Sequence, residues 1–407
     1  MSTNIVIVGG GHAAAQLCAG LAEAGQGGRV HLVCEEAAIP YHRPPLSKTF
    51  LKSPDEQPQQ HRAEAWYAEA GITMHLGDAA LAIDRAARTV TLQSGTVLGW
   101  ERLVLATGTR ARRLSALAGL SNVALLRAAD EAAQLRSLLA AAQHVTVLGG
   151  GFIGLEVAAT ALALGKQVLV LESAPRLLSR AVSPELSAHV LATHRAAGMD
   201  LRVGVQSGAM QTDGPRLVAI EVDGVPQAID LLLLGIGAVP ETALAEAAGL
   251  ECADGIVVDA YMQTSDERVL AVGDCTRFPD RRAGQAMRLE SVQNANDQAR
   301  TAVATLTGAP RPHDAVPWFW SDQGSLRLQM AGLVPPPGTP GHATVRRPGA
   351  SATSFSLLHY VDGQLRCVES VNAPVDHMMS RKLLEAGRSP DPAVAADPAV
   401  PLKTHLA

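Results

Sequence analysis

Apolar and polar positions near the N-terminus change their period twice within a short stretch. Residues 5–8 are four consecutive β-branched residues, three glycines follow, and residues 13–24 have the apolar spacing of a helix. Residues 30–33 form a second, largely apolar run that ends just before Glu35. A strand, a glycine turn, a helix and a second strand in this order predict the start of a βαβ unit.

The same order returns in the middle of the chain. Residues 145–148 predict a strand, residues 149–151 are glycines, and residues 152–164 predict a helix. A second strand at residues 167–171 then leads into Glu172. One chain therefore carries two predicted nucleotide-binding folds.

Shorter apolar runs extend both units. Two of them, residues 231–234 and 269–272, lead directly into glycine turns, which is typical of strands whose ends lie against a cofactor. Two further strands are predicted at residues 89–92 and 103–106.

Beyond Pro310 the pattern changes. Several prolines and the triplet Trp318-Phe319-Trp320 introduce a new region, and we interpret it as a mixed α+β domain. The predicted fold is thus α/β, with two Rossmann-like domains and a C-terminal α+β domain. The stretch 390–401, rich in proline, alanine and aspartate, is expected to be extended or loose. The strand-like runs of this domain are residues 325–332, 352–359 and 364–370.

Composition narrows the possible partners. With 407 residues, 47% of them apolar, the chain can form several hydrophobic cores. Its net charge of −5 comes without a lysine-arginine block, so we expect neither nucleic acid nor an anionic membrane as the partner. The longest apolar stretch, residues 231–239, is too short for a membrane helix, and no secretory signal is recognised. A cytoplasmic location is expected.

The five cysteines are far apart in the sequence and form no C-x-x-C or C-x4-C pair. They also have no metal-ligand spacing with histidine, so neither disulfides nor a metal site are predicted. We expect each to be a small buried hydrophobic residue. They are Cys18, Cys34, Cys252, Cys275 and Cys367.

The first glycine motif, Gly9-x-Gly11-x-x-Ala14, has the spacing that lets a pyrophosphate approach backbone amides at a helix N-terminus. Glu35, 21 residues after Ala14, is placed to accept hydrogen bonds from a ribose diol. The motif follows a strand and opens a helix, so we predict a dinucleotide here.

The second motif, Gly149-x-Gly151-x-x-Gly154, repeats the arrangement, with Ile153 inside it and Glu172 18 residues after its last glycine. A carboxylate that binds the ribose 2′-hydroxyl repels a 2′-phosphate, which favours NADH over NADPH. Arginines at positions 176 and 180 leave this preference open, because an arginine can also meet a phosphate.

We expect FAD at the first motif and NADH at the second. Two distant segments, residues 43–48 and the Gly273-Asp274 turn, are expected to close over the first site and retain its cofactor. A flavin accepts hydride without a catalytic acid or base, so no catalytic triad is predicted. The FAD-binding domain would comprise residues 1–110 and 238–312, the NADH-binding domain residues 111–237, and the C-terminal domain residues 313–407.

These motifs together resemble the ferredoxin, putidaredoxin and rubredoxin reductase family, within the larger glutathione-reductase-like group. The resemblance covers nearly the whole chain. It is carried by residues 5–14, 43–48, 105–108, 149–156, 235–237, 271–274, 288–291 and 317–323.

The resemblance implies roles for individual residues. Lys48 would lie beside the isoalloxazine, where a cation favours the reduced flavin. Glu156 would meet the nicotinamide end of NADH, although a helix-surface glutamate is the alternative. Trp320 would lie near the flavin edge that faces the electron acceptor, although it could simply pack between domains. The remaining residues implied to contact FAD are Ala13, Glu35, Ala80, Arg127, Asp274 and Val292, with Arg43 and Arg110 nearby.

The sequence departs from the family's pattern in three places. His12 stands where a small or apolar residue is usual, and its side chain could cap the turn. Ala128 follows Arg127 where relatives carry a hydroxyl, and Glu241 stands where many carry asparagine. None of these changes removes a predicted phosphate site.

The resemblance implies that the protein takes hydride from NADH onto FAD and passes single electrons to a [2Fe–2S] ferredoxin that serves a P450 or a ring-hydroxylating oxygenase. Disulfide reductases of the same group need a C-x4-C pair over the flavin, which this chain lacks. Reduction of rubredoxin and a redox-signalling role like that of apoptosis-inducing factors remain alternatives. A monomer is expected, because no second subunit is needed to complete such a site.

Overall fold

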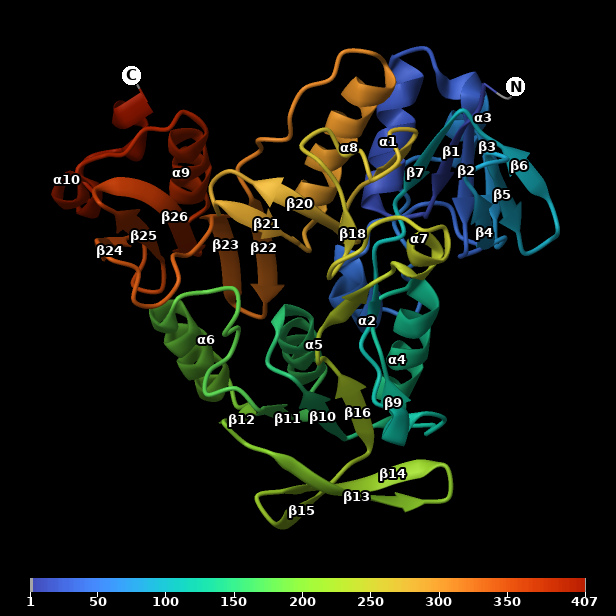
Figure 1. Ribbon diagram of the computed structural model, residues 1–407. Helices are drawn as coiled ribbons and strands as arrows, with labels where there is room; N and C mark the ends of the chain where they lie inside the picture. Colours follow the sequence, from blue (N-terminus) through green and yellow to red (C-terminus); the bar gives the residue numbers. More distant parts are fainter. Residues whose placement is uncertain (1–2, 407) are drawn as a thin grey trace. The chain divides into compact units, whose positions relative to one another are not determined.

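The computed structural model describes residues 3–406, and their contacts divide the chain into two compact units (Figure 1). The first unit comprises Met1–Arg43, Pro58–Arg110 and Val239–Ala315. The second comprises Pro44–Gln57, Ala111–Ala238 and Val316–Ala407. By contacts, the C-terminal region therefore groups with the second glycine motif.

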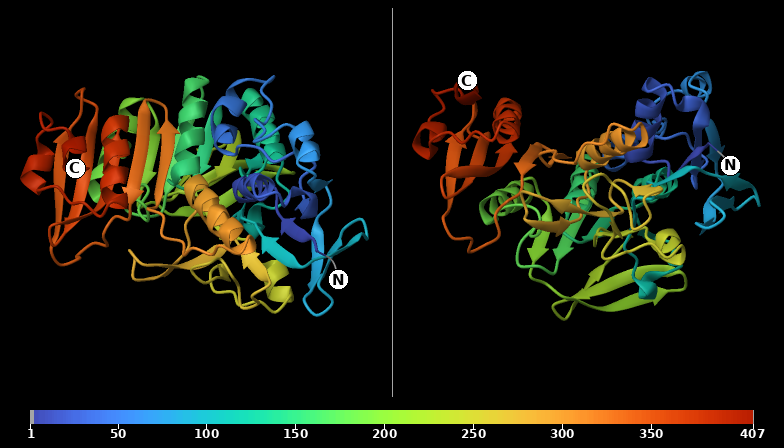
Figure 2. Two further views of the ribbon diagram at one scale, coloured as in Figure 1. Left: turned by 90° about the horizontal axis from the view of Figure 1, so that it is seen from above. Right: turned by 45° about the horizontal axis from the view of Figure 1, so that its top comes forward.

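A five-stranded parallel sheet organises the first unit, in the order β19-β7-β1-β2-β3. Helices α1 and α8 pack side by side (Figure 2), and a Cβ on Gly20 of α1 would lie 2.9 Å from Val303 of α8. The parallel strands are β1 (Ile5–Val8), β2 (Val30–Cys34), β3 (Thr73–Leu76), β7 (Arg102–Leu105) and β19 (Val269–Ala271). The other elements are α1 (His12–Glu23), η1 (Gly27–Arg29), α3 (Glu64–Glu69), β4 (Ala80–Asp84), β5 (Thr89–Leu92), β6 (Val97–Gly99), α7 (Ala243–Ala247), β18 (Ile256–Val257), β20 (Thr276–Asp280), β21 (Gln285–Met287) and α8 (Val292–Leu306).

The second unit contains another parallel sheet, in the order β12-β11-β10-β16-β9. A three-stranded antiparallel sheet, β13-β14-β15, lies between β12 and β16 along the chain. The parallel strands are β9 (Val123–Ala124), β10 (His144–Leu148), β11 (Gln167–Glu172), β12 (Asp200–Val203) and β16 (Leu231–Leu234). The other elements are η2 (Pro44–Ser47), α2 (Thr49–Lys52), η3 (Ser115–Leu117), α4 (Ala129–Ala141), α5 (Phe152–Ala163), α6 (Pro184–Ala196), β13 (Ser207–Asp213), β14 (Arg216–Val222) and β15 (Val225–Ala228). Two short strands, β8 (Thr109–Ala111) and β17 (Ala238–Pro240), stand near the sequence boundaries of the units.

The C-terminal part of the second unit is a five-stranded antiparallel sheet with the order β22-β23-β26-β25-β24, and α9 packs against β23 and β26 (Figure 2). Its elements are β22 (Trp318–Gln323), β23 (Leu326–Gly332), β24 (His342–Pro348), β25 (Phe355–Val361), β26 (Gln364–Val371), α9 (Pro374–Glu385), α10 (Pro392–Ala396) and η4 (Leu402–Leu406). Two Rossmann-like parallel sheets and a C-terminal sheet with helices confirm the predicted fold class.

The expectation that residues 390–401 are extended or loose is wrong. This stretch contains α10, and it is bonded to the side chain of Arg347, a residue that is 4% exposed. Arg347 donates hydrogen bonds to the carbonyls of Ala395, Asp397 and Val400 at 2.9, 2.6 and 3.1 Å, and it forms an ion pair with Asp376. A buried cation orders a segment that its composition alone describes as a tail.

Candidate nucleotide-binding sites

The first glycine of each motif is required by the protein itself. Gly9 has a φ of +124°, and a Cβ there would lie 2.2 Å from the carbonyl oxygen of Ala106. Gly149 has a φ of +109°, and a Cβ there would lie 2.4 Å from the carbonyl oxygen of Gly235. Both positions combine left-handed backbone with a close approach to the neighbouring strand end, so a larger residue cannot occupy them without strain.

At the second glycine of each motif, a side chain would meet no close contact in the described part of the chain. No atom described lies within 4 Å of a Cβ placed on Gly11, and the nearest one to a Cβ on Gly151 is 3.8 Å away. Both residues have negative φ values, which other residues also adopt. The open space over these two glycines is therefore where a ligand could approach the backbone.

Both helices that start at these glycines have uncapped N-termini. Neither α1 nor α5 has a side-chain cap among the described residues, and neither has an acidic residue in its first turn. The first backbone amides of a helix have no partner within the helix, and the helix dipole makes this end positive. An anionic pyrophosphate fits both places.

Several residues predicted to bind FAD converge in the first unit. The turn after β19 lies against the start of α1, because a Cβ on Gly273 would be 3.4 Å from the Cβ of Ala13. The carboxylate of Asp274 also acts electrostatically on Arg43. Burial by itself would lower the pKa of Arg43, but Tyr41, Glu36 and Asp274 outweigh burial and raise it.

A network beside β2 fixes the guanidinium of Arg43. Arg43 forms an ion pair with Glu36 at 2.6 Å, and Tyr41 donates to the second oxygen of Glu36 at 2.5 Å. Glu35 follows the end of β2 and is exposed, so its carboxylate is accessible as the predicted ribose ligand requires. Ala80, at the start of β4, is half-buried.

Other predicted residues have clear positions within their own units. Val292 is the first residue of α8, in the first unit. Arg110, also in the first unit, forms an ion pair with Glu241 at 2.9 Å. Glu241, which stands where many relatives carry asparagine, thus has a charged partner. Arg127 and Trp320 belong to the second unit, where both are half-buried.

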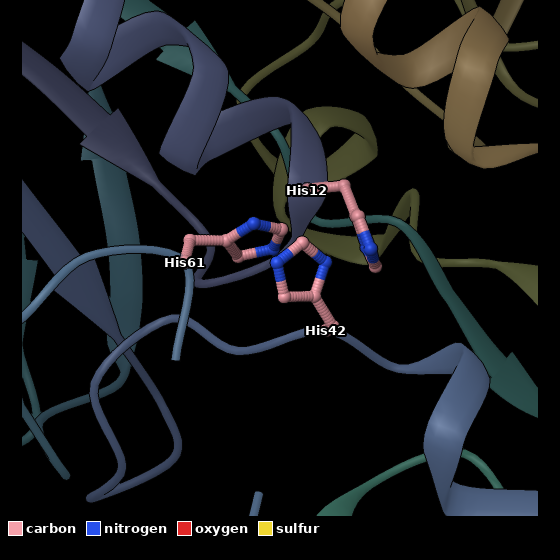
Figure 3. Close-up of side chains that lie close together, drawn as sticks. All are labelled: His12, His42 and His61. Carbon is pink, nitrogen blue, oxygen red and sulfur yellow. The ribbon is translucent and has the colours of Figure 1, made fainter. Parts of the chain in front are cut away.

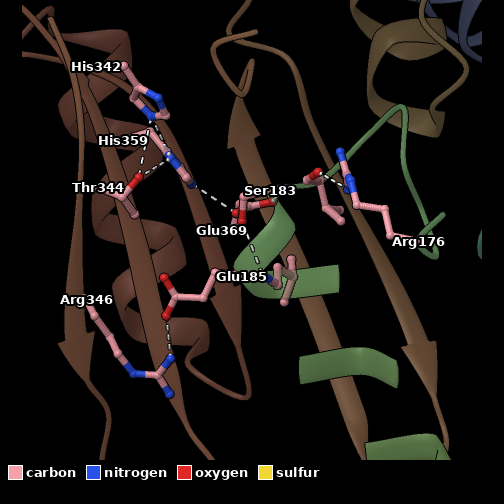
Figure 4. Close-up of polar contacts among 10 residues, drawn as sticks. Arg176, Ser183, Glu185, His342, Thr344, Arg346, His359 and Glu369 are labelled. Carbon is pink, nitrogen blue, oxygen red and sulfur yellow. Dashed lines mark hydrogen bonds and ion pairs between the residues drawn. The ribbon is translucent and has the colours of Figure 1, made fainter. Parts of the chain in front are cut away.

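At the second motif, Glu172 closes the glycine loop. Its two carboxylate oxygens accept hydrogen bonds from the backbone amides of Gly150 and Ala174, each at 2.7 Å. Ile153, in the first turn of α5, is 45% exposed. Arg176 donates to the carbonyls of Ser179 and Val182 at 2.7 and 2.8 Å, so its guanidinium already fixes the loop that follows β11 (Figure 4).

Glu156 is a buried residue and not a helix-surface glutamate. It is 4% exposed, and one of its oxygens accepts from the hydroxyl of Ser47 at 2.5 Å and from the ammonium of Lys48 at 2.6 Å. Its other oxygen accepts from the hydroxyl of Ser321 at 2.7 Å. The segment that carries Lys48 is tied down again by Thr160, whose hydroxyl donates to the Ser47 carbonyl at 2.8 Å. Two residues singled out from the sequence, Lys48 and Glu156, are thus in direct contact.

Sequence reasoning missed a cluster of three histidines (Figure 3). The ring nitrogens of His12, His42 and His61 lie within 4.8 Å of one another. Burial and Arg62 lower the pKa of His42, while burial, His42 and Arg62 lower the pKa of His61 to about 4. The ring centroids of His42 and His61 are 3.9 Å apart, and burial, with a smaller contribution from the Arg62 charge, disfavours a proton on either ring.

A second cluster that the sequence did not reveal joins α6 to the C-terminal sheet (Figure 4). Glu369 is fully buried, accepts from the backbone amide of Ser183 at 2.8 Å and lies 2.9 Å from a ring nitrogen of His359. The other ring nitrogen of His359 lies 3.2 Å from both His342 and Thr344. These contacts satisfy a buried carboxylate and anchor the residue that caps α6.

Two family models together match most of the chain. The model described as pyridine nucleotide-disulphide oxidoreductase matches residues 3–299, and the one described as reductase C-terminal matches residues 318–406. No helix within residues 3–406 is long and apolar enough to cross a membrane. The five cysteines, all within that range, are free.

Known proteins of similar sequence and structure extend over the same length. The terpredoxin reductase of a Pseudomonas species is 40% identical over 404 residues, covering 98% of this chain and 97% of that protein. The crystal structure of the ferredoxin reductase for the CYP199A2 system from Rhodopseudomonas palustris has a TM-score of 0.94 and 42% identity, covering 99% of this chain and 100% of that one. The structure of a covalent putidaredoxin reductase–putidaredoxin complex has a TM-score of 0.92 and 36% identity, with 99% and 98% covered.

Proposed function

The chain belongs to the pyridine nucleotide-disulphide oxidoreductase family, and from this premise we propose that it is an FAD-dependent NADH:ferredoxin reductase. It takes hydride from NADH onto FAD and passes single electrons to a [2Fe–2S] ferredoxin, which serves a P450 or a ring-hydroxylating oxygenase. The observation that carries the proposal is the duplicated glycine turn, in which each second glycine opens onto an uncapped helix N-terminus. Two such places fit two dinucleotides.

The residues of the first unit fit FAD. Gly11 and the start of α1 would hold its pyrophosphate, exposed Glu35 its adenine-side ribose, and Asp274 and Arg43 its ribityl and flavin end. When bound, the flavin converts the two electrons of a hydride into single-electron transfers. Gly9, Ala14, Ala80 and Val292 complete the proposed set in this unit. Lys48, Arg127 and Trp320 belong to the second unit, and their contact with FAD stays a prediction from the resemblance.

The second unit supplies the proposed NADH site. The amides after Gly151 would hold the pyrophosphate, while Gly154 lets α5 approach β10, because a Cβ there would lie 2.6 Å from the carbonyl of Gly149. Glu172 would exchange its bonds to backbone amides for bonds to the ribose diol, and its charge would repel the 2′-phosphate of NADPH. Arg176 already donates to two backbone carbonyls, so these N–H groups are not available to a 2′-phosphate.

Lys48 and Glu156 act at the reacting end. The buried carboxylate of Glu156 would stabilise the positive charge that grows on the nicotinamide as hydride leaves. It also holds the Lys48 ammonium at 2.6 Å, and this ammonium would favour negative charge on the reduced flavin. Neither residue has to donate or remove a proton for hydride transfer.

The absence of a redox-active cysteine pair from the sequence indicates how electrons leave the flavin. All five cysteines are free; Cys18, Cys34, Cys275 and Cys367 are buried as expected, whereas Cys252 is only half-buried. Burial raises the pKa of Cys18, Cys34 and Cys275, which disfavours their reactive thiolate form. With no disulfide to relay electrons, the flavin must pass them directly to a partner. The relative bound to putidaredoxin supports a ferredoxin as that partner. We also infer a monomer in the cytoplasm, where NADH and free thiols are maintained.

A test with three acceptors separates the proposal from its alternatives. The purified flavoprotein is mixed with NADH and a [2Fe–2S] ferredoxin, a rubredoxin or a disulfide substrate, and acceptor reduction is followed by absorbance. We expect efficient reduction of ferredoxin and none of the disulfide. Preferred reduction of rubredoxin would assign that acceptor instead. Gly151→Ala is the matched control, because it should block reduction by NADH while chemically reduced protein still reduces ferredoxin.

A further inference from the structure

Glu156 lies at one end of a buried hydrogen-bond chain that the proposed cofactor contacts leave unexplained. Oε1 of Glu156, the oxygen that does not contact Lys48, accepts from the Ser321 hydroxyl at 2.7 Å. The side-chain amide nitrogen of Gln323 donates to Ser321 at 3.0 Å, and the Gln323 amide oxygen lies 2.9 Å from Nε2 of His194. All four side chains belong to residues that are at most 4% exposed. The chain runs from α5 through β22 to α6 within the second unit.

The pleat of β22 explains how one strand contacts both helices. Residues at every second position of a strand share a face. Phe319, Ser321 and Gln323 share the face that meets the helices, since Phe319 stacks edge-on against Phe152 of α5, one turn before Glu156. Trp318 and Trp320 occupy the opposite face, with their rings 5.8 Å apart.

The direction of every bond in the chain is fixed. Because the Gln323 amide nitrogen donates to the Ser321 oxygen, the Ser321 hydroxyl proton is available to Glu156. The Gln323 carbonyl oxygen is then left to accept, so His194 must carry its proton on Nε2. Burial lowers the pKa of His194, which keeps this imidazole neutral.

We propose that Ser321, Gln323 and His194 are positioning residues for hydride transfer, because they orient the carboxylate of Glu156 that accepts from the Lys48 ammonium. The ring of His194 sets the Gln323 amide, the amide sets the Ser321 hydroxyl, and the hydroxyl fixes one oxygen of Glu156. The other oxygen then faces Lys48 and Ser47. This inference rests on the proposed function, and it assigns a catalytic purpose to polar residues that otherwise only fill the core of the second unit.

The kinetic test uses the flavin-loaded Ser321→Ala variant. Anaerobic stopped-flow mixing with NADH at several concentrations separates the limiting rate of flavin reduction from NADH affinity. We expect the limiting rate to fall about tenfold, since small displacements at a reacting centre cost one to two orders of magnitude, while NADH affinity changes less than about threefold. Ser321→Thr retains a hydroxyl and should restore most of the rate.

Two comparisons keep the kinetic result specific. Ser356→Ala removes another buried strand hydroxyl, which pairs with Ser370 at 2.9 Å, and it should leave the rate unchanged. Gln323→Met should slow reduction in the same direction, and its effect should not add to that of Ser321→Ala if the two act as one chain. If Ser321→Ala fails to fold, Gln323→Met carries the test. A limiting rate within twofold of wild type would overturn the inference and leave the proposed function standing.

A spectroscopic measurement tests the chain without turnover. In protein labelled with 15N-histidine, the His194 resonances are identified by their loss in His194→Gln. We expect the neutral form with the proton on Nε2 at pH 7, and a change in these resonances when Ser321 is replaced by alanine. A proton on Nδ1, or a charged ring, would contradict the bond directions. If wild-type flavoprotein were not reduced by NADH at all, the proposed function itself would fail, and the catalytic purpose of the chain with it.

Discussion

The second glycine of the first motif offers a test in which ligand binding and folding are separable. In Gly11→Ala the new methyl group meets no described atom within 4 Å, and the backbone, with φ −90° and ψ −168°, suits alanine. We therefore expect the free energy of unfolding of the flavin-free protein to change by less than about 0.5 kcal/mol, as for a substitution without contacts. A larger effect that appears only in the flavin-loaded protein must then come from the ligand.

The same methyl group occupies the space through which a pyrophosphate would approach α1. Loss of one or two hydrogen bonds between backbone amides and a charged oxygen costs about 1.5–3 kcal/mol each. FAD affinity should thus fall on the order of 100-fold. The assay is fluorescence titration of flavin-free protein with FAD, together with the flavin-to-protein ratio after purification.

Gly9→Ala is the contrasting variant. Its Cβ would lie 2.2 Å from the Ala106 carbonyl at a φ of +124°, so it should lose FAD because the fold itself is damaged. Circular dichroism and thermal unfolding distinguish the two variants. Gly11→Ala protein with normal stability and normal FAD affinity would refute the assignment of this turn as the pyrophosphate site.

Three further predictions concern other parts of the molecule. Glu172→Gln removes the carboxylate charge, so the ratio of kcat/KM for NADH to that for NADPH should fall at least several-fold; an unchanged ratio would show that Glu172 does not face the ribose. His377 is 3% exposed and burial lowers its pKa to about 4, so its unfolded form gains a proton first and stability is lost as the pH falls from about 6.5 to 4. Between pH 7 and pH 4.5 the unfolding free energy should fall by about 2–3 kcal/mol less in His377→Asn than in the wild-type protein. The same pH dependence in both proteins would argue against a role of His377 in the loss of stability. Arg347→Met leaves three carbonyls without their donor, so limited proteolysis should cut near residues 390–401 much faster than in wild type, whereas Arg346→Met, at a half-exposed position, should not change the cleavage.

The nucleotide-binding units could be predicted because their signals are local. A β-branched run, a glycine turn and an amphipathic helix lie within one stretch of sequence, and the structure places β1 at Ile5–Val8, where the pattern predicted it. The predicted helix at residues 152–164 likewise corresponds to α5, Phe152–Ala163. The first glycine of each motif has a close backbone contact, whereas the second faces open space, so its role at a phosphate site stays a prediction from the spacing.

What could not be predicted depends on contacts between distant residues. Glu156 could not be recognised as buried, because Ser321 is 165 positions away in the sequence. The histidine cluster joins residues from three separate segments, and the order of the C-terminal tail depends on Arg347, about 50 positions earlier. The sequence spacing between these residues does not predict that they are in contact.

The most direct test of the account is anaerobic stopped-flow absorbance of the purified flavoprotein, mixed first with NADH and then with an oxidised [2Fe–2S] ferredoxin. We expect rapid bleaching of the flavin band by NADH, followed by rapid reoxidation as ferredoxin is reduced. Slow bleaching, together with a reduced flavin that ferredoxin fails to reoxidise, would contradict the reductase assignment.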